Sequence, residues 1–303
     1  TSADTSVTYT MEDGAGNQSQ ATLTITVSNP NAPPVASDDA VSTNEGSVLS
    51  GDLFADNGSG VDSDTSTSIT VTQVNASPNA GTQITLPSGA LLTVSNTADD
   101  GSFDYDPNGA YDGLAAGATD TDTFTYTLSD GDLTDTATVT VTLTGVNDAP
   151  VLSAAAPTAV TTDEDTTSAS FQVATLLGAS VSDVDSGAVE GIAVTATTGN
   201  GTLEYSFDDS NWTPVGSVAD TSALLLRASD YLRYAPDGES GETADLTYRA
   251  WDQTGATAGQ QGSKVDASSN GAATPFSTAT DTASIQVNDL NDAPVLTPAG
   301  PTA

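Results

Sequence analysis

A short motif rich in carboxylate and amide oxygens occurs near residue 148 and again near residue 291. The first copy reads Gly145-Val146-Asn147-Asp148-Ala149-Pro150, and the second reads Asp289-Leu290-Asn291-Asp292-Ala293-Pro294. A related stretch, Asn29-Pro30-Asn31-Ala32-Pro33-Pro34, has the Asn residues but no Asp. Sets of oxygen ligands suit hard cations, and calcium takes about six to eight of them. The motif therefore predicts cation binding at these three positions, with the weakest or most altered site at the first.

The net charge of the chain supports cation binding. Its 303 residues include 41 acidic and 4 basic side chains, which gives a formal charge of −37 at pH 7. All four basic residues lie between Arg227 and Lys264, so ion pairs within the chain cannot balance the charge. Nucleic acid and anionic membranes are poor partners for such a surface. A solvated, salt-adapted surface is the alternative explanation of the acidic residues.

The residue types that are absent narrow the chemistry further. The chain contains no cysteine and no histidine, which excludes disulfides, thiol catalysis and zinc sites built on these residues. No run of about 18 apolar residues occurs, so we expect no insertion into a membrane. Calcium is the expected cofactor.

The elements around the motif are predicted to be β-strands. Each copy follows a run in which Thr alternates with apolar residues, such as residues 136–142, and alternation of this kind is typical of strands. The proline then ends the strand and stiffens the connection, so each copy ends one domain and begins the next. We expect residues 1–31 to be the C-terminal hairpin of a preceding domain, 32–147 a β-sandwich, 148–292 a larger sandwich with a long loop at 253–278, and 293–303 the start of the next repeat.

An internal repeat supports this division. Three segments align without gaps: Tyr9-Thr10-Met11-Glu12-Asp13, Tyr126-Thr127-Leu128-Ser129-Asp130 and Tyr248-Arg249-Ala250-Trp251-Asp252. A turn and an alternating strand follow each of them. About seven short strands separated by turn residues in each whole domain indicate a Greek-key sandwich.

These residues resemble cadherin-type domains. More closely, the chain is similar to the cadherin-like tandem repeats of large bacterial surface adhesins that are exported by type I secretion and often carry repeats-in-toxin (RTX) modules. The resemblance rests on Asp289-x-Asn291-Asp292-x-Pro294 as a linker motif, on Asp183-Val184-Asp185 and Asp62-Ser63-Asp64 as Asp-x-Asp loops, on Ala250-Trp251-Asp252, and on the stretch from Gly101 to Pro150. It implies an all-β fold of tandem Greek-key cadherin/immunoglobulin-like β-sandwich domains joined by calcium-binding linkers.

The up-and-down order of strands in such a sandwich sorts the acidic loops into three calcium sites. We expect the ligands Asn31, Asp62, Asp64 and Asp130 at the first linker; Glu45, Asp120, Asp122, Asn147, Asp148, Asp183, Asp185 and Asp252 at the second; and Glu164, Glu242, Asp245, Asp289, Asn291 and Asp292 at the third.

The expected function is structural and not enzymatic. The chain would be a calcium-rigidified extender segment of an extracellular or cell-surface adhesin that supports cell adhesion or biofilm attachment, with neighbouring repeats as its partners. Two alternatives remain. In the first, Tyr205 and Trp212 or the 253–278 loop bind a carbohydrate or protein ligand, although such aromatic residues more often fill a core. In the second, the N-terminal hairpin complements a neighbouring sandwich and builds a filament.

Overall fold

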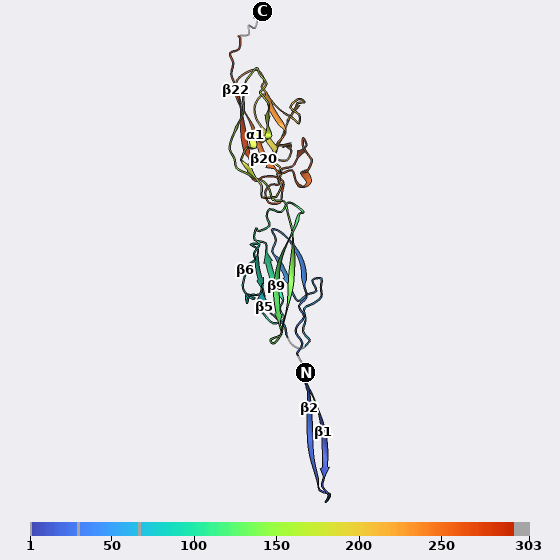
Figure 1. Cartoon of the computed structure of the whole chain (residues 1–303). Coiled ribbons are helices and arrows are strands. Elements are labelled where there is room, and N and C mark those ends of the chain that lie inside the picture. The colour runs from blue at the N-terminus through green and yellow to red at the C-terminus, as the bar shows by residue number, and fades with distance from the viewer. Residues whose placement is uncertain (1, 29–30, 66–67, 294–303) are drawn as a thin grey trace, which may run out of the picture. The chain divides into compact units, whose positions relative to one another are not determined.

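The structure is a computed structural model that describes residues 2–28, 31–65 and 68–293 (Figure 1). These residues are almost entirely β-strand and turn, with one short helix, α1 (Val173–Leu177), and one 3-10 turn, η1 (Gly255–Thr257). The chain divides into two compact units, each described by itself: unit 1 is Thr1–Tyr111 with Thr119–Thr144, and unit 2 is Asp112–Ala118 with Gly145–Ala303. The predicted start of a further repeat at 293–303 lies, beyond Ala293, outside the described residues.

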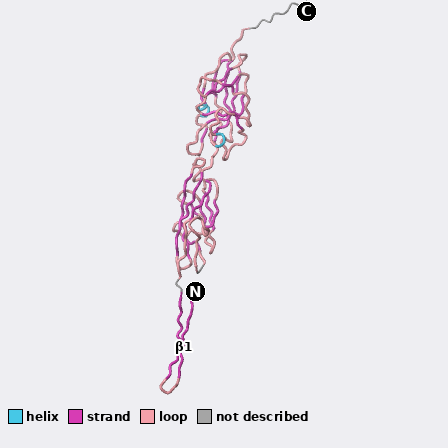
Figure 2. The backbone as a smooth tube through the Cα atoms, turned by 90° about the vertical axis from the view of Figure 1, so that its right-hand side faces the viewer, coloured by secondary structure: helices cyan, strands magenta, loops and turns pink. Residues whose placement is uncertain are grey.

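An N-terminal hairpin forms a two-stranded sheet of its own (Figure 2). Strands β1 (Ser2–Glu12) and β2 (Gln18–Ser28) pair antiparallel with Val7 opposite Leu23, and Asp13 closes the turn by accepting two backbone N–H groups. Residues of like parity share one face of a strand, so the apolar side chains gather on one side of the hairpin. They are all exposed, with Val7 and Leu23 each 55% exposed.

Unit 1 contains two four-stranded sheets. Its strands are β3 (Asp39–Asn44), β4 (Leu49–Asp52), β5 (Thr70–Val74), β6 (Ile84–Thr85), β7 (Leu91–Val94), β8 (Ser102–Asp106), β9 (Thr119–Ser129) and β10 (Thr134–Thr144). The order is β3-β10-β9-β5 in one sheet and β4-β8-β7-β6 in the other, and β3 runs parallel to β10. Alternate residues of the strands are buried, which is the pattern of a sandwich with one wet face per sheet.

The core of unit 1 lies between these sheets. Phe103 of β8 and Phe124 of β9 meet edge to face with ring centroids 6.0 Å apart. Tyr126 and Val139 are fully buried on the same inner face as Phe124. The β9–β10 pair therefore contributes apolar side chains to the core, and its Thr residues face outward.

Unit 2 is larger. Its strands are β11 (Val151–Leu152), β12 (Thr158–Asp163), β13 (Phe171–Gln172), β14 (Val181–Ser182), β15 (Gly191–Thr197), β16 (Thr202–Ser206), β17 (Thr213–Pro214), β18 (Ala223–Arg227), β19 (Tyr231–Ala235), β20 (Glu242–Trp251), β21 (Lys264–Val265) and β22 (Asp281–Asn288). The six-stranded sheet has the order β12-β22-β20-β15-β18-β21, the four-stranded sheet β13-β19-β16-β17, and β11 pairs with β14. Within the described residues, no helix is long and apolar enough to cross a membrane.

Unit 2 has two apolar cores because its large sheet is buried on both faces. The main core packs residues such as Ile192, Leu226 and Tyr248. A second core on the opposite face contains Trp251 and Phe276 together with Ala193, Ala223, Leu225 and Ala267. Phe276 and Ala267 come from the segment predicted as a long loop at 253–278, so this segment is a cover over the sheet and not an open loop.

Candidate metal centre

Most of the predicted metal ligands lie near the ends of the strands of their unit. We call the end where the chain enters a unit its leading end, and the end where the chain leaves it the trailing end. The leading end of unit 2 begins with the linker residues Asn147 and Asp148, which precede β11. Asp183 and Asp185 follow β14, the partner of β11, and Asp252 follows β20. The sequence predicted that these five residues belong to one site, and the structure brings them together.

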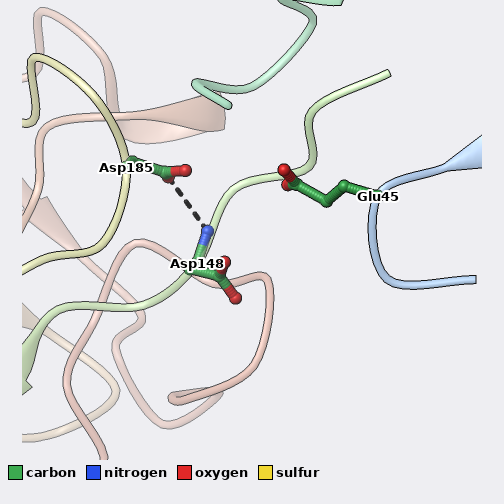
Figure 3. A group of neighbouring side chains, drawn as sticks. All are labelled: Glu45, Asp148 and Asp185. Atoms are coloured by element: carbon green, nitrogen blue, oxygen red, sulfur yellow. Dashed lines mark hydrogen bonds between the residues drawn. The ribbon is translucent and has the colours of Figure 1, made fainter. Parts of the chain in front are cut away.

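Asp148 and Asp185 are joined through the backbone. The Asp148 N–H donates to Asp185 Oδ2 at 3.0 Å, as Figure 3 shows. The Asp185 N–H in turn donates to Asp183 Oδ1 at 2.9 Å, which folds the Asp-x-Asp loop toward the linker. Two backbone hydrogen bonds thus bring together three acidic residues from the linker and from the loop after β14. Glu45, the third residue labelled in Figure 3, belongs to unit 1 and is described with it below.

Asn147 connects the linker to the end of β20. Its Nδ2 donates to Asp252 Oδ2 at 2.9 Å and to the Thr274 carbonyl at 3.2 Å. The other oxygen of the Asp252 side chain, Oδ1, accepts the N–H and the hydroxyl of Thr254 at 2.8 and 2.7 Å. Asp252 is 3% exposed. Its charge is therefore held in place by local donors at the edge of the sheet.

Several oxygens at this leading end are buried without a donor. Asn147 Oδ1, Asp183 Oδ2 and Asp185 Oδ1 are inaccessible and have no hydrogen-bond partner among the described residues. A buried polar atom without a partner is unfavourable, and native structures rarely leave one without a bound water or ion to explain it. All three are atoms that a hard cation can use as ligands.

The pKa shifts of these carboxyl groups also favour a bound cation. Burial raises the pKa of Asp183 above its usual range, and repulsion by Asp252 and Asp148 adds to the shift. Burial also raises the pKa of Asp185, with further repulsion from Asp183. For Asp148 the pKa is raised by burial first and by Asp112 second. Each of these pKa shifts means that the ionised carboxylate is unfavourable in the folded protein unless a cation or a proton neutralises it.

No basic side chain in the described part of the chain relieves this repulsion. The ion pairs found there join Arg233 to Glu204 and Arg249 to Asp220. A depression of about 200 Å³ opens beside the cluster, and its lining includes Asp183, Asp185, Asp252 and Trp251. The acids therefore border a space that solvent and ions can reach.

The trailing end of unit 2 brings together part of the predicted third set. Glu164 is 1% exposed, and its Oε1 accepts the Leu290 N–H at 2.8 Å, while Oε2 is buried with no partner among the described residues. Asp289 Oδ1 accepts the Gly241 N–H at 3.2 Å. Asn291 and Asp292 follow Asp289 and Leu290 in the sequence and are exposed.

Glu242 and Asp245 are engaged elsewhere. Glu242 Oε1 accepts the Tyr234 hydroxyl at 2.6 Å, and its carboxylate also accepts the Asn200 N–H. Asp245 lies within β20, where its Cα pairs with that of Ser284 of β22. Strand β20 begins at Glu242, so both residues form part of it.

The leading end of unit 1 is built on the same plan with fewer carboxylates. Asn31 Nδ2 donates to Asp130 Oδ2 at 2.7 Å. Asp62 is buried, where it accepts the Ser37 N–H and the Tyr126 hydroxyl, each at 2.6 Å. Asp64, two residues on, completes the predicted set. Hydrogen bonds from the backbone of Leu133 and Asp132 lower the pKa of Asp130, the opposite of the shifts at Asp183 and Asp185.

The trailing end of unit 1 holds Glu45, Asp120 and Asp122. The Glu45 N–H donates to the carbonyl of Thr144, the last residue of β10, at 3.1 Å. Asp120 and Asp122 lie within β9, where Asp120 pairs with Leu143, and not in a loop before the strand. Asp122 accepts the Tyr105 and Ser88 hydroxyls. Asp122 therefore accepts hydrogen bonds from two hydroxyls in unit 1, while Glu45 and Asp120 lie at the trailing end.

Asp39 and Asp281 were not singled out by the sequence and are almost fully buried. Asp39 accepts Asn57 Nδ2 at 2.9 Å, and its pKa is raised to about 6, chiefly by burial and then by repulsion from Asp62. Asp281 accepts the N–H groups of Ala155 and Ala156, each at 3.0 Å. Both begin a strand, which is the only signal that the sequence offers for them.

The aromatic residues proposed as a ligand surface are partly occupied by the protein itself. The Arg233 guanidinium lies 4.2 Å from the centroid of the Trp212 ring, and it also pairs with Glu204 at 2.8 Å. Tyr205 packs against the main core and against Phe207, with ring centroids 5.4 Å apart. Both rings therefore already have partners within unit 2.

Residues 31–145 match the family model of the bacterial cadherin-like domain. The match spans all the strands of the unit 1 sandwich, β3 to β10. A search of curated proteins finds no match. The structure is all-β, and unit 1 is a cadherin-like β-sandwich.

Among solved structures, similar ones include the extracellular cadherin domains 1–5 of protocadherin gamma B2, with 16% identity, 95% of this chain and 46% of that chain covered, and a TM-score of 0.47. Domains EC1-2 of human protocadherin-24 match with 16% identity, 87% and 100% coverage, and a TM-score of 0.45. An endo-fucoidan hydrolase of glycoside hydrolase family 107 matches with 17% identity, 93% and 34% coverage, and a TM-score of 0.28. The chain spans about half the length of the protocadherin gamma B2 structure.

Proposed function

We propose that the leading end of unit 2 binds calcium, and that the chain is a calcium-dependent, non-enzymatic segment of an extracellular adhesion protein built from cadherin-like repeats. The observation that carries the proposal is the convergence of Asn147 and Asp148 on Asp183, Asp185 and Asp252, with buried oxygens that lack a donor among the described residues. The match of residues 31–145 to the bacterial cadherin-like family supports the extracellular setting.

The residues fit calcium because every candidate ligand is oxygen. Asp183 Oδ2, Asp185 Oδ1 and Asn147 Oδ1 are the atoms free to coordinate, and the carboxylates of Asp148 and Asp252 add charge. Two carboxylates about 4 Å apart repel by about 1 kcal/mol in water and by about 4 kcal/mol at an effective dielectric of about 20. Bound calcium would supply the positive charge that this end of unit 2 does not obtain from the chain.

Fixing the linker is the mechanical consequence. Asn147 and Asp148 belong to the connection into unit 2, whereas Asp183, Asp185 and Asp252 follow strands of the sandwich. A cation shared by both groups would add to the hydrogen bonds that hold the connection against the sandwich, so the joint would be stiffer with calcium than without it. We propose that a series of such joints extends an adhesive tip away from the cell surface. Glu45 and Asp120 remain predicted ligands of the second linker, and Asp289, Asn291 and Asp292 remain predicted ligands of the third.

A structural role is favoured over catalysis by repetition. The same Asn–Asp hydrogen bond occurs at the leading ends of both units, as Asn31–Asp130 and Asn147–Asp252. An active site is normally needed once in a chain, whereas a structural ligand set is needed at every joint. The paired acids therefore fit cation binding better than acid–base catalysis.

Calorimetry of the whole chain tests the proposal. Calcium that binds only the folded state at about 100 times Kd adds about 2.7 kcal/mol per site. For a unit of this size that raises Tm by roughly 5 to 10 °C. Sodium chloride at the same ionic strength controls for simple screening of the −37 charge, and magnesium controls for divalent charge alone. Equal shifts with all three salts would mean a salt-adapted surface and would contradict the calcium site.

Self-assembly is a second candidate that one observation favours. The exposed face of the β1–β2 hairpin repeats the inner face of β9–β10: Tyr9 pairs with Ala21 as Tyr126 pairs with Ala137. In unit 1 that face is buried by the second sheet, so the hairpin has the composition of half a sandwich. If hairpins find partners in other chains, sedimentation will show a mass that rises with concentration, and replacing Leu23 and Ile25 with Lys will abolish the rise. A monomer at high concentration would contradict this candidate.

A further inference from the structure

The connection between β20 and β22 is the feature that most distinguishes unit 2 from unit 1. In unit 1 the equivalent strands, β9 and β10, are joined by residues 130–133. In unit 2 the chain instead continues through residues 253–278, adds β21 to the edge of the large sheet and covers its outer face with Phe276 and Ala267. The cover begins directly after Asp252, so it starts inside the proposed calcium site.

Three backbone carbonyls of this segment reach the linker and Asp252. The Ala272 carbonyl accepts the Ala149 N–H at 2.8 Å. The Thr274 carbonyl accepts Asn147 Nδ2 at 3.2 Å. The Pro275 carbonyl accepts the Asp252 N–H at 3.2 Å. Residues 272–275 therefore lie against both the linker and the end of β20.

The position of residues 272–275 is set by the residues immediately C-terminal to them. Phe276 bridges to Trp251 and is 2% exposed in the second core. Arg249, on β20, lies under the same segment and is 9% exposed. One of its terminal nitrogens donates to the carbonyls of Ser277 at 3.1 Å and Thr278 at 2.6 Å. A buried guanidinium thus fastens the C-terminal end of the cover to the sheet.

We infer that residues 253–278 are a clamp that fixes the linker residues Asn147–Ala149 on unit 2, and that Arg249 is the positioning residue that holds the clamp. The clamp itself rests on the hydrogen bonds above, and its effect on calcium rests on the proposed function. Ligands that are already in place lose less freedom when they bind, so clamped ligands bind more tightly than mobile ones. Groups that orient metal ligands commonly change metal affinity by about 10- to 100-fold.

The direction in which calcium affinity changes when Arg249 is removed tests the inference. As a positive charge in the same unit as an acidic site, it repels calcium, so simple electrostatics predicts that removing it strengthens calcium binding. The clamp predicts the reverse. Arg227, at the end of β18 in the same sheet, provides a control with the same change of charge.

The first experiment compares Arg249→Met, Arg249→Lys and Arg227→Met in the full chain by calcium titration calorimetry. We expect Arg249→Met to weaken binding by about tenfold. Arg249→Lys should recover part of the loss because an ammonium can still donate to the two carbonyls, and Arg227→Met should leave affinity unchanged or slightly raise it. Equal effects of the Arg249→Met and Arg227→Met changes would overturn the inference.

The second experiment measures amide hydrogen exchange by NMR in the presence of chelator and needs no calcium. The Ala149 N–H should be protected in the wild type and exchange faster in Arg249→Met. The Asp148 N–H, which is bonded to Asp185 and not to the clamp, should change less. Rapid exchange at Ala149 in the wild type would overturn the clamp even if Arg249→Met cannot be folded. If calcium fails to bind but Ala149 is protected, the proposed function fails and the clamp stands.

Discussion

The leading ends of units 1 and 2 share one hydrogen bond and differ in the carboxylates around it. In both, an Asn of the linker donates to the Asp that ends the repeated Tyr-x-x-x-Asp segment. Unit 1 has Ala32 where unit 2 has Asp148. The Asn–Asp pair is therefore part of the architecture, whereas the added carboxylate is the feature that we expect to make the proposed cation site of unit 2 stronger than that of unit 1.

The two units also differ in the acid that holds their buried tyrosine. In unit 1, Tyr126 donates to Asp62, whose pKa is raised by burial. In unit 2, Tyr248 donates to Asp281, whose pKa is lowered because backbone N–H groups outweigh its burial. The tyrosine at this equivalent position therefore faces a carboxylate whose negative charge is unfavourable in unit 1 and stabilised in unit 2. Unit 1 contains no basic residue that could relieve its buried acids.

The largest expected effect comes from neutralising the Asp of the shared pair. Asp252→Asn keeps the shape and removes the charge, and we expect it to weaken calcium binding to unit 2 by about 100-fold, since calcium affinity follows the number of charged ligands. Asp130→Asn is the matched change in unit 1 and should alter calcium binding by less. Calcium titration of both variants checks this, and equal losses would mean that the two leading ends are equivalent sites.

The next effect concerns pH and has opposite signs in the two units. Asp39 has a folded pKa of about 6, above the ordinary value of 3.8, so unit 1 binds more protons than its unfolded chain and gains stability as pH falls toward 4. Asp39→Asn should therefore stabilise unit 1 by about 2 kcal/mol near pH 7.5, and the gain should shrink at about pH 5.

Asp281 provides the contrast. Its pKa is lowered, so its contribution is present above the ordinary pKa and is lost only as pH falls below it. Asp281→Asn should destabilise unit 2 by about 2 kcal/mol, the scale of hydrogen bonds to a charged group. The loss should be nearly the same at about pH 7.5 and about pH 5. Thermal unfolding in chelator at both pH values checks both variants; the same sign for both would contradict the comparison.

A smaller effect should follow from exchanging the residue that distinguishes the two linkers. Asp148→Ala gives unit 2 the pattern of unit 1, and we expect calcium binding to weaken by about tenfold because one charged ligand is lost. Ala32→Asp gives unit 1 the pattern of unit 2 and should strengthen binding there. Titration of the two variants side by side sharpens the comparison, and it fails if Asp148→Ala leaves affinity unchanged.

The smallest effect is expected at Trp212. Replacing it with Ala removes the contact with Arg233, worth about 0.5 to 1 kcal/mol at an exposed site. Calcium affinity should not change, because Trp212 lies on the hairpin between β16 and β17 and does not line the depression beside the carboxylates. A glycan array probed with both proteins tests the ligand-binding alternative. Binding by the wild type that Trp212→Ala abolishes would establish a second function beside calcium.

The sequence was informative where chemistry and strand order coincide. Alternation of Thr with apolar residues predicted β9, β10 and β22, and the strand order predicted that Asp183, Asp185 and Asp252 would lie near Asn147. It was less informative at strand boundaries. Asp120 and Glu242 lie within strands and not before them, because paired Thr-rich strands extend further than their apolar residues indicate. Strand β4 was missed because Leu49–Asp52 contains one apolar residue and a Gly.

The second core of unit 2 could not be predicted from local pattern. Residues 253–278 are rich in Gly, Ala, Ser and Gln, which is typical of an exposed connection. Their structure depends on a few residues distant in the chain: Trp251 packs against Phe276, and Arg249 holds the carbonyls of Ser277 and Thr278. Neither contact has a periodicity that a single sequence reveals. The raised pKa of Asp39 likewise depends on its burial and on repulsion from Asp62, which is distant in the sequence.

Terbium luminescence tests the central claim most directly, because terbium is a hard cation that replaces calcium and emits when a nearby indole transfers energy to it. The chain has two tryptophans, and Trp251 lines the same depression as Asp183, Asp185 and Asp252. In full-length Trp212→Phe protein, excitation of the remaining Trp251 should produce terbium emission that calcium displaces and that Asp252→Asn largely removes. Absence of sensitised emission, or emission that Asp252→Asn leaves unchanged, would contradict a cation site at the leading end of unit 2.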